Sequence, residues 1–121
     1  MSNTYVQNTT DITAARNLLR RKINGANWSV PFRARASTAL TAVGEFIVSS
    51  GKPGTMEVGV VMSRGTWGVE LKSTLHEANT DGLPKLREQL SRLADEVKID
   101  CQASRVCLTV HLWLTGKGPS F

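Results

Sequence analysis

The chain has 121 residues, of which 40% are hydrophobic and 21% are charged, a length and composition typical of one folded domain. No apolar run reaches the roughly 18 to 20 residues of a membrane helix, and the polar start of the chain lacks the pattern of a secretion signal. The net charge of +5 arises in residues 1–54, which carry seven basic and two acidic residues, because residues 55–121 carry eight of each. An acidic or phosphate-bearing partner would therefore be attracted to the first half of the chain.

Cysteine and histidine are too few to suggest a metal centre. The chain has two cysteines, Cys101 and Cys107, and two histidines, His76 and His111. Their spacing matches no zinc site, so we expect no bound metal. The two thiols could lie close enough for a disulfide across a tight turn. Two buried free thiols in a reducing cytoplasm are the simpler expectation.

The first half of the chain predicts a short edge strand at residues 4–9, followed by two helices. Asp11 can cap the first helix, because its carboxylate can accept from free backbone N–H groups. Apolar residues then recur at three- and four-residue steps, at Ile12, Ala15, Leu19 and Ile23. Asn24-Gly25 ends this helix. The second helix runs from Pro31 to Val48, before a breaker rich in glycine and proline at residues 50–54.

In the second half the apolar pattern changes to a period of two, which is typical of strands with one buried face. Four strands are predicted, at residues 56–63, 67–72, 97–101 and 108–114. Leucines mark a third helix at 83–93, and a three-residue turn at 103–105 joins the last two strands. The predicted fold is an α+β two-layer sandwich, with a mixed sheet of four or five strands and three helices on one face. It forms one domain over residues 1–115, followed by a flexible tail at 116–121.

Several short blocks carry a resemblance to a known family. They are Asp11–Arg16, Ala39–Glu45, Leu83–Arg87, Leu93–Val97 and Leu108–Trp113. In this order they resemble the anti-sigma-factor serine/threonine kinase family (RsbT-like), within the GHKL superfamily of histidine-kinase-type ATPase domains. The resemblance covers residues 10–114 and rests on spacing and on the Leu-Ala-Asp-Glu-Val block. It implies a shortened GHKL (Bergerat-like) fold and a role in bacterial signalling.

The resemblance implies ATP and Mg²⁺ held between the second helix, a glycine-rich lid and the sheet. Glu45 matches the family's catalytic Glu, but Ser49 stands where an Asn would hold Mg²⁺, and a hydroxyl is a poorer ligand. Ser73 lies near the position of the Asp that reads adenine, and no glycine follows it until Gly82, so the lid is missing. Losing the buried adenine contact alone costs about 1–3 kcal/mol.

These losses predict a non-catalytic or degenerate RsbT-like protein without a cofactor, acting in the cytoplasm by binding a protein partner. The family's partners are STAS-type antagonists, sigma factors or signalling enzymes. Arg16, Arg20 and Arg21 on the first helix are the candidate partner-binding residues, together with His111 and Trp113 on the open face of the sheet. An exposed tryptophan is typical of interfaces, and the same open face could also form a homodimer.

Two other functions stay open from the sequence. One is an active, ATP- and Mg²⁺-dependent serine/threonine kinase of a STAS-type antagonist, with Glu45 as the base and Ser49 near the metal. The other is nucleic-acid binding through the basic first half, since two helices joined by a short loop suggest a helix-turn-helix. Beyond Arg33 and Arg35 the second helix has few long polar residues to read bases, so we do not expect nucleic acid as the partner. The basic residues could also be a solvated helix face.

Overall fold

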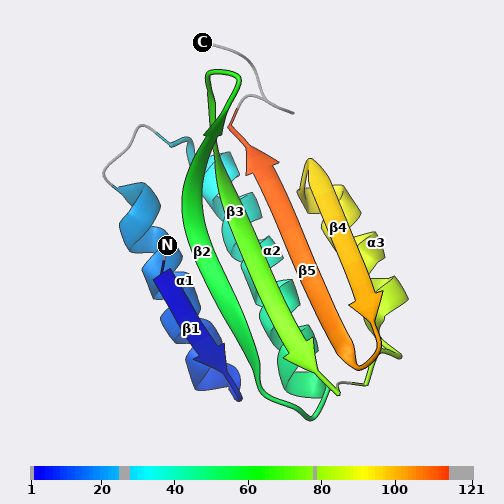
Figure 1. Cartoon of the computed structure of the whole chain (residues 1–121). Helices are drawn as coiled ribbons and strands as arrows, with labels where there is room; N and C mark the ends of the chain where they lie inside the picture. The colour runs from blue at the N-terminus through cyan, green and yellow to red at the C-terminus, as the bar shows by residue number, and fades with distance from the viewer. Residues whose placement is uncertain (1, 25–27, 78, 115–121) are drawn as a thin grey trace.

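The computed structural model describes residues 2–24, 28–77 and 79–114. Five strands and three helices follow one another in the order β1-α1-α2-β2-β3-α3-β4-β5 (Figure 1). Their bounds are Ser2–Val6 for β1, Thr9–Asn24 for α1, Val30–Ser49 for α2, Gly54–Ser63 for β2, Thr66–His76 for β3, Leu83–Leu93 for α3, Glu96–Gln102 for β4 and Arg105–Trp113 for β5. None of the described helices is long and apolar enough to span a membrane.

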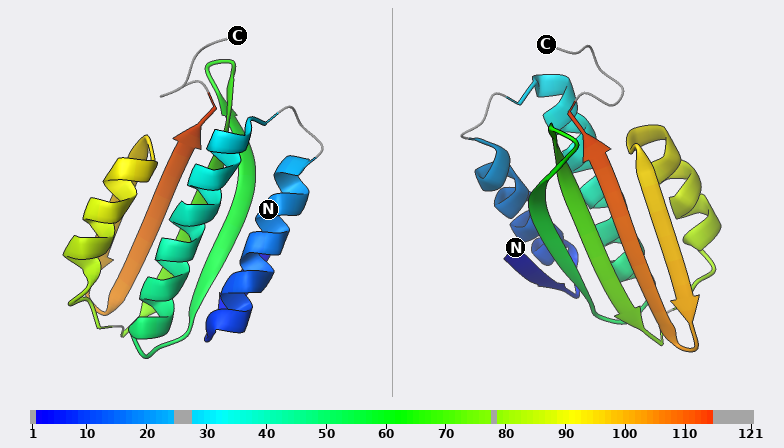
Figure 2. Two further views of the ribbon diagram at one scale, coloured as in Figure 1. Left: turned by 180° about the vertical axis from the view of Figure 1, so that it is seen from behind. Right: turned by 45° about the horizontal axis from the view of Figure 1, so that its top comes forward.

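The strands form one sheet in the order β1-β2-β3-β5-β4, and the three helices pack on one face of it (Figure 2). This confirms the predicted α+β two-layer sandwich. The sheet is antiparallel at every described pairing, however, rather than mixed. The reason is topological: β3 and β4 run in the same direction, but β5 lies between them, so they never pair.

The first helix begins earlier than predicted. α1 starts at Thr9, because Asn8 rather than Asp11 is its N-cap: Oδ1 of Asn8 accepts from the backbone N–H of Asp11 at 3.1 Å. Asp11 lies within the first turn, and its Oδ2 accepts from the N–H groups of Gln7 at 2.8 Å and Asn8 at 3.3 Å. Together Asn8 and Asp11 form a reciprocal capping arrangement. Gly25, predicted to end this helix, lies outside the described residues, as does the tail at 116–121.

The cysteines are free thiols, as expected, but their predicted placement opposite each other is wrong, because the β4–β5 hairpin turns through two residues, 103–104, instead of three. The register therefore pairs Cys101 with Val106 and Cys107 with Asp100. Since successive side chains alternate between the faces of a strand, this one-residue offset places the thiols on opposite faces. Both cysteines are free; Cys101 is exposed and Cys107 is half-buried, so neither is a core residue.

The hydrophobic core fills the space between the sheet and the helix layer. The strands contribute Val6, Met56, Val58, Val69, Leu71, Leu75, Val106, Leu108, Val110 and Leu112. α1 and α2 approach closely at Gly44, where a methyl group would lie 2.8 Å from Ile12. This arrangement leaves two broad surfaces, the outer side of the helices and the open face of the sheet (Figure 2).

Candidate functional site

The structure separates Ser73 from Glu45 and Ser49, the three residues that the resemblance predicted at a nucleotide site. Glu45 and Ser49 are exposed on the last turns of α2, and the Ser49 hydroxyl donates to the backbone carbonyl of Phe46 at 3.0 Å. Ser73 lies on the helix-facing side of β3 and is only 3% exposed. Within the described residues its Oγ has no hydrogen-bond partner. Ser73 therefore does not share an accessible pocket with Glu45 and Ser49.

Apolar side chains pack around the end of α2, close to the end of β3 and the start of α3. A methyl group on Gly82, just before α3, would lie 3.7 Å from the ring of Phe46, which is 6% exposed. A methyl group on Gly54 would lie 3.1 Å from both Ile47 and Leu75, which are fully buried. The end of α2 is thus closed by hydrophobic contacts with the start of β2, the end of β3 and the start of α3.

A hollow of about 350 Å³ lies between α1 and α2 on the outer side of the helix layer. Its lining includes three arginines and three aliphatic residues, Arg16, Arg20, Arg33, Leu19, Ile23 and Val30. We call this hollow the arginine groove. No carboxylate lines it.

The cations of the arginine groove are poorly neutralised. Arg16 donates to the hydroxyls of Thr13 and Thr41 at the long distance of 3.4 Å. Within the described residues Arg20 makes no ion pair, and the buried Nε of Arg33 has no hydrogen-bond partner. Arg35, two residues further along α2, instead donates to the Leu93 carbonyl near α3. Three guanidinium groups without a counter-charge create a positive potential that attracts an anionic group.

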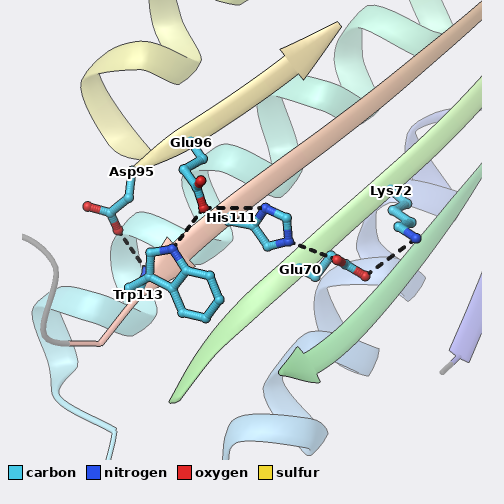
Figure 3. A network of polar contacts seen from close by, with 6 residues as sticks. All are labelled: Glu70, Lys72, Asp95, Glu96, His111 and Trp113. Carbon is cyan, nitrogen blue, oxygen red and sulfur yellow. Dashed lines mark hydrogen bonds and ion pairs between the residues drawn. The ribbon is translucent and has the colours of Figure 1, made fainter. Parts of the chain in front are cut away.

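The open face of the sheet carries a polar network across β3, β5 and β4 (Figure 3). His111 on β5 pairs in register with Glu70 on β3 and with Glu96 on β4. Its Nε2 lies 2.8 Å from Oε2 of Glu70, and its Nδ1 lies 3.8 Å from Oε1 of Glu96. The indole N–H of Trp113 donates to the same Glu96 oxygen at 3.0 Å. One carboxylate thus joins the imidazole and the indole.

Several contacts hold the half-buried Trp113 in place. Its ring stacks on His111, with centroids 5.4 Å apart and planes at 4°. Its backbone N–H donates to Oδ2 of Asp95 at 2.7 Å. The ring also lies over Gly68, where a methyl group would come within 2.4 Å of it. Across the described part of the chain, no group of three or more His, Cys, Asp or Glu residues is arranged to hold a metal ion.

The five predicted partner-binding residues fall into three places. Arg16 and Arg20 line the arginine groove. His111 and Trp113 lie on the opposite side of the molecule, in the network of Figure 3. Arg21 is exposed on α1 and does not line the groove.

Three further residues were missed as site residues. Glu70 and Glu96 join the network on the open face, and Arg33 supplies the α2 side of the groove. The signal for Glu70 was present in the sequence, because it alternates with the apolar residues Val69 and Leu71. No local signal marks Arg33, since its role depends on how α2 packs against α1.

Comparison with known proteins adds no assignment to this geometry. No protein family and no curated protein matches the chain.

Proposed function

We propose that this protein is a non-catalytic, RsbT-like regulatory protein that acts by binding a protein partner in bacterial signalling. The proposal follows the resemblance of its sequence blocks to that family. It is carried by one observation, the apolar packing of Phe46, Ile47 and Leu75 around the end of α2. In the family, this is where the second helix, the lid and the sheet would enclose ATP.

Two details support a nucleotide-free domain. Only residues 77–82 separate β3 from α3, which leaves no length for a glycine-rich lid. A lid would supply the backbone N–H groups that bind phosphates. Ser73 is 3% exposed, so its hydroxyl is not accessible to an adenine. Without a lid or an accessible polar contact, we expect no ATP and no Mg²⁺.

Partner binding is supported by the arginine groove, whose charges the chain itself leaves unneutralised. The resemblance implies a STAS-type antagonist, a sigma factor or a signalling enzyme as the partner. The open face, with Trp113 and His111, is a second contact surface in this proposal, either for the same partner or for a homodimer. Sedimentation equilibrium of the purified chain would measure the homodimer directly.

Calorimetric titration with Mg-ATP tests the proposal. We expect no binding heat, because the apolar side chains already occupy the space that adenine would need. Binding at micromolar concentrations would contradict the proposal. A phosphotransfer assay tests the alternative, an active kinase. Transfer of labelled phosphate to a STAS-domain protein that is abolished by Glu45→Ala would establish catalysis and contradict the proposal.

A further inference from the structure

We propose that the arginine groove binds an acidic segment of the protein partner, with carboxylates on either side of an apolar anchor residue. This inference rests on the proposed function, because it names the chemistry of the partner. It is drawn from the lining of the groove, which combines cationic and aliphatic side chains.

The charge of the groove selects an anionic partner. Arg16 and Arg20 are four residues apart on α1, so both lie on one side of that helix, and Arg33 faces them from α2. Since none of the described residues that line the groove is a carboxylate, they do not neutralise this cluster. Guanidinium groups bind carboxylates through paired hydrogen bonds, which gives both attraction and a defined geometry.

Arg33 gives the most specific indication of a missing acceptor. Its Nε is buried and has no hydrogen-bond partner within the described residues. A buried donor without an acceptor raises the free energy of the unbound protein. Since Arg33 lines the groove, a carboxylate seated there would give its guanidinium group an acceptor that the described residues do not supply.

The aliphatic part of the groove selects an apolar anchor. Leu19 and Ile23 line it from α1, and Val30, at the start of α2, is 68% exposed. An apolar side chain seated here would remove the exposed surface of Val30 from water, which favours association. The volume of about 350 Å³ suits a few side chains rather than a nucleic-acid backbone. Phosphates would gain nothing from an aliphatic lining, so an acidic protein segment fits better than nucleic acid.

Fluorescence anisotropy with a labelled synthetic peptide tests this proposal on the full-length chain. The peptide contains glutamate and leucine, spaced so that the leucines form one face of a helix. A matched peptide has glutamine in place of every glutamate. We expect the glutamate peptide to bind about tenfold more tightly or better, as charge-assisted hydrogen bonds imply. Equal binding of the two peptides would overturn the proposal, as would no binding of either.

Variants of the chain locate the site. The double variant Arg20→Gln/Arg33→Gln should weaken binding of the glutamate peptide by about tenfold or more. Val30→Ser should also weaken it, without any change of charge. Arg21→Gln is the matched control, because Arg21 is exposed on the same helix outside the groove, and binding should change less than about twofold. If Arg21→Gln weakens binding as much as the double variant, the attraction comes from the charge of α1 in general and the groove is not the site.

Two further measurements distinguish loss of binding from loss of folding, and peptide binding from nucleic-acid binding. Circular dichroism and thermal unfolding of each variant check that lost binding is not lost folding. If a labelled DNA duplex binds more tightly than the peptide, with an affinity that falls steeply with salt, the surface is a nucleic-acid site and the proposal is wrong. ATP binding, by contrast, would contradict the proposed function and leave peptide binding to the groove intact.

Discussion

The two surfaces of the sandwich carry charged side chains in opposite ways. On the open face of the sheet, Glu70, His111 and Glu96 lie in one row across three strands and contact one another (Figure 3). On the helix side, the arginine groove brings three cations together without a lining carboxylate. The polar side chains of the open face therefore contact one another, whereas the described residues give the arginines of the groove no ion pair.

The secondary structure explains the difference. Register places residues of neighbouring strands directly opposite each other, so hydrogen-bonding side chains on one face meet and stabilise the sheet. The groove instead forms between two helices whose facing residues include arginines but no acid. Contacts within the chain therefore favour stability on the sheet side, and on the helix side they leave the cations that our proposal assigns to partner binding. Three experiments test this contrast, through the effect of substitutions on the free energy of unfolding.

The largest effect is expected for Gly68→Val. The valine side chain would overlap both the ring of Trp113 and the backbone carbonyl oxygen of Leu112, and displacing the indole would also break its contact with Glu96. We expect the free energy of unfolding to fall by about 1–3 kcal/mol, with a change in tryptophan fluorescence. Gly65→Asn is the control, because that turn position is open and asparagine tolerates its positive φ of 78°. Unchanged stability of Gly68→Val would show that the network does not fix Trp113.

A double-mutant cycle measures the internal pairing of the open face. Glu70→Gln and His111→Asn should show a coupling energy of about 1 kcal/mol, because the pair is 2.8 Å apart and largely shielded from water. The matched control is the Glu88–Arg92 pair on α3, 2.7 Å apart but with side chains 66% and 73% exposed. Its coupling should stay below about 0.5 kcal/mol. Equal coupling energies in the two pairs would contradict the prediction, because shielding from water would then add nothing to the Glu70–His111 contact.

The smallest effect on stability is expected for Arg33→Gln. Arg33 has no ion pair within the described residues, and removing its charge relieves repulsion from Arg16 and Arg20. Chemical denaturation should therefore give a free energy of unfolding within about 0.5 kcal/mol of the parent chain. A loss well above that value would assign Arg33 a structural role and weaken the case for the groove as a binding surface.

Much of the fold could be predicted because its signals are local. The leucine spacing and Pro84 placed the third helix at residues 83–93, where the structure has α3. Alternation of apolar residues placed the strands β2 to β5 and the buried faces of their central parts. Met62 and Trp67, predicted on the buried face, are instead 53% and 49% exposed, and β1 spans Ser2–Val6 rather than residues 4–9. Short connections were harder to predict. The turn between β4 and β5 is one residue shorter than predicted, and the cap of α1 lies three residues earlier, at Asn8. A shift of one residue was enough to separate Cys101 from Cys107, because it exchanges the faces of a strand.

The candidate site could be predicted only in part. The sequence placed the excess positive charge in the first half and showed that Ser49 and Ser73 depart from the family's nucleotide motif. It could not show that Arg33 would join Arg16 and Arg20, because this depends on the packing of α1 against α2.

The sequence by itself determined which segments are helices and strands, which of their faces are apolar, and where the charge lies. These properties depend on residues a few positions apart, so periodicity and capping are enough to specify them. The tertiary structure alone decided which charges meet and which stay unpaired. Glu70 and His111 are separated by 41 positions in the chain and Arg16 and Arg33 by 17, and only strand register and helix packing bring them together.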